Sequence, residues 1–194
     1  MRKLLIIIII YSLSSCSQKP TRHFTFNEIG WTIELPDGFE VLDSANSAAR
    51  MEKSKKTVEA STDDKIVALN TRHLIVAKKN VSNYFICSLT PYIELTPGSW
   101  QSSIQKIRDL SFELLVKKFP SAQFDTLTSS ITIDSLSFSK FLTAGKEDGK
   151  LLYHSVMLSK LYKIYDLKIS YVCDDFSIEK EIEEMLRNSK FSNE

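Results

Sequence analysis

Short runs of alternating apolar and polar residues recur along most of the chain, as expected for strands that bury one face of a sheet. Turn-forming residues separate many of them, such as the Pro-Asp-Gly sequence at residues 36–38 and the Asp-Ser pair at residues 134–135. This spacing predicts mostly antiparallel strands that are joined by hairpins. The predicted strands cover residues 24–26, 31–35, 72–79, 83–93, 124–133, 136–145, 151–162 and 163–173.

Two helices are predicted before the last strands. Residues 43–61 are rich in Ala, Lys, Glu and Met and have a thin apolar face, which is typical of a peripheral helix. Residues 99–119 form a second predicted helix, with Ser99 as its N-cap and Pro120 directly after its end. The predicted buried face of this second helix consists of Ile104, Ile107, Ser111 and Leu114, widened by Leu110, Leu115 and Phe119.

A third helix is predicted near the end of the sequence, where apolar residues again recur at helical spacing. Its candidate N-caps are Asp174, Asp175 and Ser177, and its apolar face consists of Ile178, Ile182, Met185 and Leu186.

The order of these elements predicts a single α+β domain over residues 24–194, because a mostly antiparallel sheet needs helices to cover its apolar faces. Three segments resemble the PsbP-like proteins, whose fold is shared by the photosystem II extrinsic protein and a Ran-binding nuclear import factor. They are GWTIELPDGFEV at residues 30–41, VMLSKLYKIYDLKISY at 156–171 and EEMLRNSKF at 183–191. The resemblance implies an α/β/α sandwich and, by analogy, a non-catalytic accessory or docking module.

The first residues have the layout of a secretory signal. Arg2 and Lys3 precede a strongly apolar run from Leu4 to Tyr11. The ten residues from Leu4 to Leu13 would extend about 15 Å as a helix, which is too short for the roughly 30 Å of hydrocarbon in a bilayer. Ordinary signal cleavage prefers a small-x-small site such as Ala-x-Ala, and residues 1–20 contain no alanine, although the serines are weak substitutes.

Leu13-Ser14-Ser15-Cys16 resembles the lipobox of bacterial lipoproteins. The resemblance implies a diacylglyceryl group on the Cys16 thiol, cleavage between Ser15 and Cys16, and acylation of the new amino terminus by a chain such as palmitate. Two or three acyl chains make a durable membrane anchor. Because Ser17 rather than Asp follows the cysteine, Gram-negative sorting implies the periplasmic face of the outer membrane. The expected parts are a signal peptide at residues 1–15, a lipidated tether at 16–23 and the domain at 24–194.

The charge balance gives no indication of a nucleic-acid partner. The chain has 25 Lys and Arg against 24 Asp and Glu, and from Cys16 onwards it has 23 against 24. A nucleic-acid-binding domain normally carries a clear basic excess. The two resemblances instead imply the membrane, through the lipid anchor, and a protein of the cell envelope as the expected partners.

No catalytic or metal-binding motif stands out, and no cofactor is predicted. His23, His73 and His154 have no helical metal-ligand spacing, and Ser99 lacks the Gly-x-Ser-x-Gly frame of a hydrolase. The paired acids at 63–64 and 174–175 fit loop and helix-cap roles. A hydrolase would need His154 or His73 to meet an acid or a nucleophile in a cleft.

Cys87 and Cys173 lie in predicted strands at the parity of apolar neighbours. An exported protein is permitted a disulfide, and a bridge that closes so long a loop would contribute about 4–5 kcal/mol in the chain-entropy model. The alternative is two separate buried thiols, which behave as small hydrophobic side chains.

Three aromatic residues are candidates for an interaction surface, namely Tyr84, Tyr92 and Trp100. The leading hypothesis is a non-enzymatic, lipid-anchored accessory or binding module that faces the periplasm. The alternative is a small-ligand carrier with a pocket between sheet and helix, and a hydrolase is third.

Replacing the lipobox cysteine tests the anchor. We expect Cys16→Ser to lose incorporation of labelled palmitate and to leave the membrane fraction, because the acylated thiol and the processing site are removed together. The matched control Cys87→Ser should keep both properties. Normal labelling of Cys16→Ser would contradict the lipoprotein prediction.

Overall fold

The computed structural model describes residues 22–43, 48, 49, 52 and 71–192 of the chain. The predicted signal peptide, Cys16 and most of the helix predicted at 43–61 therefore lie outside the described residues. Ala48, Ala49 and Glu52, which belong to that range, are helical. The predicted tether runs into the first strand, because His23 already pairs with Glu34.

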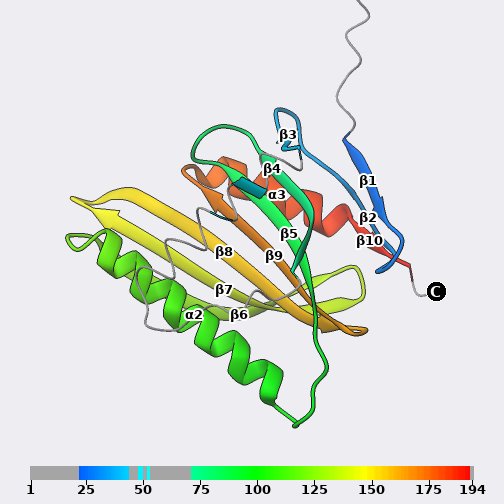
Figure 1. Cartoon of the computed structure of the whole chain (residues 1–194). Helices are drawn as coiled ribbons and strands as arrows, with labels where there is room; N and C mark the ends of the chain where they lie inside the picture. Colours follow the sequence, from blue (N-terminus) through cyan, green and yellow to red (C-terminus); the bar gives the residue numbers. More distant parts are fainter. Residues whose placement is uncertain (1–21, 44–47, 50–51, 53–70, 193–194) are drawn as a thin grey trace, which may run out of the picture.

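A seven-stranded sheet forms the centre of the domain (Figure 1). Its strands are β3 (Glu40–Val41), β4 (Arg72–Lys78), β5 (Tyr84–Pro91), β6 (Gln123–Ile133), β7 (Leu136–Glu147), β8 (Lys150–Tyr162) and β9 (Tyr165–Cys173). Their order is β3-β4-β5-β9-β8-β7-β6, and every neighbouring pair is antiparallel. The predicted hairpins from β6 to β9 are confirmed. Asp148 and Gly149 between β7 and β8 have φ of 50° and 74°, the left-handed conformation that a two-residue type I′ turn requires.

A second, three-stranded sheet joins the beginning of the domain to its end. It has the order β1-β2-β10, with β1 (His23–Phe26), β2 (Trp31–Glu34) and β10 (Lys190–Phe191). The buried Trp31 ring stacks on Phe26 and Phe191, and its Nε1 donates to Ser189 Oγ at 3.1 Å. β10 was not predicted, because two residues are too short to show a period.

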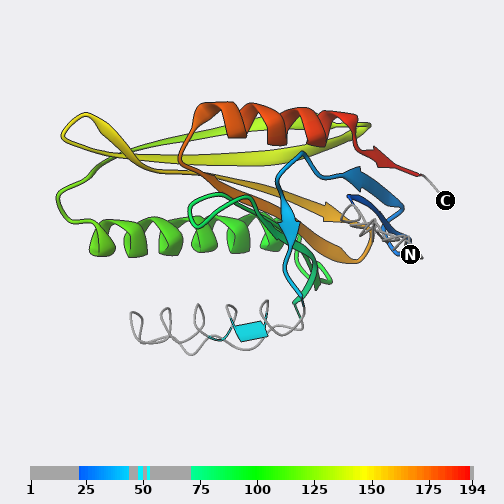
Figure 2. The same ribbon diagram turned by 90° about the horizontal axis from the view of Figure 1, so that it is seen from above.

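One helix covers each face of the large sheet, as Figure 2 shows. α2 (Ser99–Lys118) lies on one face and α3 (Phe176–Asn188) on the other. This confirms the mostly antiparallel α+β fold and its layered arrangement. Asp175 is the N-cap of α3 and accepts a hydrogen bond from the Ser177 backbone N–H. The predicted cap of α2 was wrong, since Gly98 occupies the N-cap and Ser99 is the first helical residue.

The face under α3 is a continuous apolar core. Ile182 and Leu186 of α3 are fully buried, as predicted, against the odd-numbered residues of β5 and β9. Cross-strand partners in this core include Phe85 with Tyr171 and Cys87 with Ile169. Side chains directly opposite one another share a face, so the register lines these residues up beneath the helix.

The face under α2 is much more polar. One row of cross-strand partners crosses five strands and consists of His73, Ser88, Lys168, Ser159 and Ser139. Among the residues of α2, all of which are described, Ile104 and Arg108 are buried. The predicted stripe does face the sheet, but its residues beyond Ile104 are only half-buried, because a sheet face rich in hydroxyls offers them little apolar surface.

No helix in the described part of the chain is long and apolar enough to cross a membrane.

Candidate functional site

A cavity of about 530 Å³ lies between the C-terminal half of α2 and the sheet. Its wall on α2 runs from Ser111 to Lys118, and its floor comes from β7, β8 and β9. The floor follows from the strand register, because Phe141, Met157 and Ser170 are cross-strand neighbours in one row. A space of this size is within the usual range for small-molecule sites, about 300–1,000 Å³.

Polar groups without partners gather next to this cavity. Arg108 is 6% exposed, donates from Nη2 to Ser139 Oγ at 2.8 Å and stacks 5.3 Å from the ring centre of Phe141. Its Nε and the Ser159 hydroxyl are buried without a hydrogen-bond partner. Burial lowers the pKa of the Arg108 guanidinium, but an arginine stays charged at neutral pH. This corner of the α2 layer therefore holds a buried positive charge.

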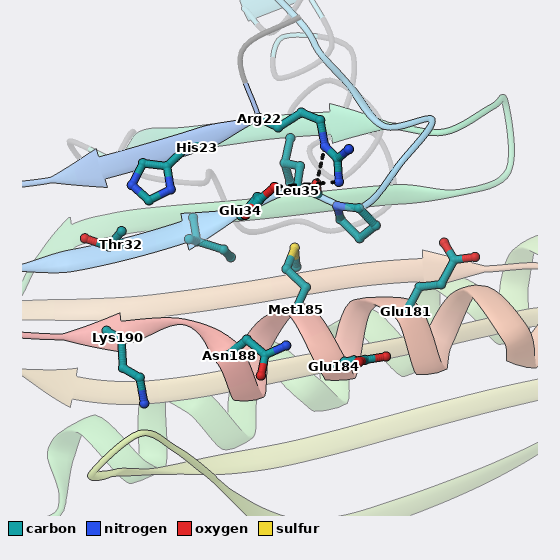
Figure 3. Close-up of a pocket in the computed structure, with 12 residues that line it drawn as sticks. Arg22, His23, Thr32, Glu34, Leu35, Glu181, Glu184, Met185, Asn188 and Lys190 are labelled. Atoms are coloured by element: carbon teal, nitrogen blue, oxygen red, sulfur yellow. Dashed lines mark hydrogen bonds and ion pairs between the residues drawn. The ribbon is translucent and has the colours of Figure 1, made fainter. Parts of the chain in front are cut away.

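A second cleft, of about 450 Å³, lies between β2 and α3 (Figure 3). Its charged lining residues are of both signs, namely Arg22, Lys190, Glu34, Glu181 and Glu184. Several are already satisfied, since Arg22 Nε donates to the Leu35 carbonyl at 2.8 Å and Glu181 binds Lys79 Nζ at 2.6 Å. The mixture gives the cleft no preference for a ligand of one charge.

His154 meets an acid, as the hydrolase alternative required, but not in a cleft. His154 Nδ1 lies 3.7 Å from Glu179 Oε2 of α3, and Phe176 packs against the imidazole edge. The histidine is 2% exposed, and burial lowers its pKa although Glu179 opposes this shift. The imidazole is buried beneath α3, so the pair does not lie in an open cleft.

Neither cysteine is activated as a nucleophile. Burial raises the pKa of the Cys173 thiol to about 12, and Glu179 raises it further. Burial also raises the pKa of Cys87. Both groups are therefore neutral thiols at physiological pH.

Of the two alternatives for Cys87 and Cys173, the structure has separate thiols rather than a disulfide. Cys87 and Cys173 are free and buried, and both belong to the α3 face. Cys87 lies opposite Ile169, four residues from Cys173 along β9, which corresponds to about 13 Å. A bridge requires Cα atoms within about 7 Å. The alternative of two separate thiols is what the structure has.

The histidines do not come together. His23 lies in the small sheet, His73 in β4 and His154 in β8. His73 Nδ1 is buried without a hydrogen-bond partner, and burial lowers the pKa of that imidazole. Within the described ranges, no group of three or more His, Cys, Asp or Glu side chains is arranged to hold a metal ion.

The structure separates one of the three candidate aromatic residues from the other two. Tyr84 begins β5, whereas Tyr92 and Trp100 lie beyond its other end, about 26 Å away along the strand. Tyr92 Oη donates to Ser99 Oγ at 3.0 Å, and Trp100 Nε1 donates to Asp166 Oδ1 at 3.0 Å. The last two therefore brace the connection between β5 and α2.

That connection exposes apolar side chains that the sequence analysis missed. Ile93 is 77% exposed, Leu95 88%, and Ile164 of the neighbouring β8–β9 turn 61%. The backbone N–H of Tyr92 donates to the Ile164 carbonyl at 2.9 Å, which places the two segments side by side. We call these three residues the distal patch. Isolated apolar residues in a loop have no periodicity, so no pattern reveals them.

Comparison with known proteins supports the fold and nothing finer. No protein-family model matches the chain, and no curated protein is significantly similar in sequence. The solution structure of cyanobacterial PsbP (CyanoP) from Synechocystis sp. PCC 6803 is similar with a TM-score of 0.52 and 7% identity, over 93% of this chain and 99% of that one. A crystal structure from Bacteroides thetaiotaomicron has a TM-score of 0.45 and 12% identity, over 91% of this chain and 50% of that one. The predicted PsbP-like fold is confirmed by the first of these.

The state of the cysteines can be checked by mass and thiol titration. We expect the native protein to show the same mass before and after reduction, and Cys87 and Cys173 to react with a thiol reagent only after unfolding, because both are buried and neutral. Cys87→Ser should remove one of these two reactive groups. A mass increase of two hydrogens on reduction would contradict the free-thiol arrangement.

Proposed function

We propose that this protein is a non-enzymatic accessory module of the cell envelope. Acyl groups on Cys16 hold it to the periplasmic face of the outer membrane, and the distal patch docks an apolar segment of a periplasmic protein. The observation that carries the docking surface is the exposure of Ile93, Leu95 and Ile164 at one end of the domain. Exposed apolar side chains that gather in one place are typical of interaction sites.

Glu94, the charged residue of the β5–α2 connection, is used within the loop itself. Glu94 Oε1 accepts hydrogen bonds from the backbone N–H groups of Gly98 and Trp100, at 3.0 and 3.3 Å. Its charge is therefore used to shape the loop that leads into α2. This leaves the apolar side chains of Ile93 and Leu95 as the chemistry that the loop presents.

The loop is also preorganised for docking. The hydrogen bonds of Tyr92, Trp100 and Glu94 tie both ends of the connection to the sheet and to α2. A loop that is already held in one conformation loses less entropy on binding, so more of the apolar contact energy appears as affinity.

The position of the patch favours a periplasmic partner over the lipid surface. The chain enters β1 near the top of Figure 1, whereas the connection from β5 to α2 lies at the bottom. A tether that reaches the membrane from the β1 end would turn the distal patch away from the bilayer. The burial of His154 beneath α3, beside Glu179, favours binding over catalysis.

Site-specific crosslinking in living cells tests this proposal. A photoactivatable residue at position 95 should give a discrete protein adduct, and the adduct should disappear when Ile93→Ser and Ile164→Ser are added, because the apolar contact is removed. Position 81 is the matched control, since Val81 is also 88% exposed but lies in the β4–β5 connection.

Adducts of equal yield from positions 95 and 81 would contradict docking at the distal patch. An adduct from position 95 that survives both serine substitutions would contradict it as well. The Cys16→Ser chain tests the contribution of the anchor. If the partner is itself held at the envelope, loss of membrane attachment should lower the adduct yield from position 95.

A further inference from the structure

We propose that the cavity between α2 and strands β7–β9 binds a single-chain amphiphile with an anionic head, of the alkyl carboxylate class. This site is separate from the distal patch, and the inference does not depend on docking there. It rests on the shape and lining of the cavity and on the charges that surround it.

The walls of the cavity suit an alkyl chain. The apolar side chains come from both layers, namely Leu114 and Leu115 of α2, Phe141 of β7, Met157 of β8 and Val172 of β9. The residues Thr143, Ser155 and Ser170 lie between them on the floor, and their small hydroxyl side chains leave space above it. A volume of about 530 Å³ in which these apolar side chains lie among small hydroxyl groups is a space that a flexible chain can fill.

The charge of the site points to an anion. Lys117 and Lys118 belong to the lining, and within the part of the chain that the structure describes no Asp or Glu is among the lining residues. Both lysines are exposed, so they stand where the cavity meets solvent. One turn before the cavity begins, Arg108 adds a buried positive charge whose Nε has no partner, in contact with the Phe141 ring of the cavity wall. Cations at both ends favour a ligand that brings a negative head.

The attachment of α2 leaves the cavity open to a guest. Contacts from Trp100 to Asp166, from Arg108 to Ser139 and from Phe112 to Phe124 fix the helix to the sheet. The cavity lies beside the stretch from Ser111 to Lys118, on the C-terminal side of the first two of these contacts. An alkyl chain can therefore enter without breaking the bonds that hold the helix.

Calorimetric titration with a homologous series tests the inference. The protein is produced directly as residues 16–194 with Cys16→Ser, so that no acyl chain of its own competes, and hexanoate, octanoate and decanoate are added below their micelle concentrations. The dissociation constant should fall about fourfold for each added methylene, as expected for burial of apolar surface. Decanol, which has the same chain without the charge, should bind about fivefold more weakly.

Two sets of variants separate the head from the tail. Lys117→Glu with Lys118→Glu should weaken decanoate about tenfold and leave decanol unchanged, because only the carboxylate meets the reversed charges. The matched control is Lys106→Glu with Lys180→Glu, which changes the net charge equally on exposed residues outside the cavity. Ser170→Leu, or Ser155→Leu if the former unfolds, fills the floor and should abolish binding of both ligands.

Four results would overturn the inference. They are no binding of decanoate at millimolar concentration, affinity that does not change with chain length, equal affinity for decanoate and decanol, and binding that survives the cavity-filling variant. The crosslink from position 95 is unaffected by Ser170→Leu under this account, so a failed ligand titration and a failed docking test are distinguishable.

Discussion

The cross-strand register of the large sheet determines which side chains each helix covers. In an antiparallel sheet, residues directly opposite one another share a face, and neighbours along a strand face opposite ways. Phe85, Tyr171 and Val156 therefore form one row under α3, while Ile86, Ser170 and Met157 form the next row under α2. A slip of one residue between β9 and its neighbours would exchange the two sets, and both the core and the cavity would be lost.

The two faces of the large sheet consequently have different roles. The face that contains Tyr171 lies under Ile182 and Leu186 of α3 and holds most of the large sheet's buried apolar residues. On the opposite face, Ser139 and Asp166 accept hydrogen bonds from Arg108 and Trp100 of α2, which hold the helix in place without closing the space beneath its C-terminal half. A stable fold of this kind can carry a binding site on one face, because the other face supplies most of the apolar burial.

Alternation and helical spacing in the sequence were sufficient to predict most of the helices and strands and the face of the sheet on which a residue lies. Alternation placed Cys87 and Cys173 at core positions, and both do face α3, but their separation depends on the register between β5 and β9, which neither strand encodes alone. Helical spacing predicted the bounds of α2 to within about a residue. The face of the sheet beneath this helix is polar, however, so only Ile104 of its predicted apolar stripe is fully buried. The distal patch and β10 were missed because a loop and a two-residue strand have no period to recognise.

The most direct test of the unequal faces is the free energy of unfolding of two matched variants in urea. Leu186 of α3 is fully buried, whereas Leu114 of α2 is half-buried beside the cavity. Leu186→Ala should lose about 3 kcal/mol, because it opens a void in close-packed core. Leu114→Ala should lose about 1 kcal/mol or less, because its side chain already borders empty space. Equal losses from the two substitutions would contradict the account.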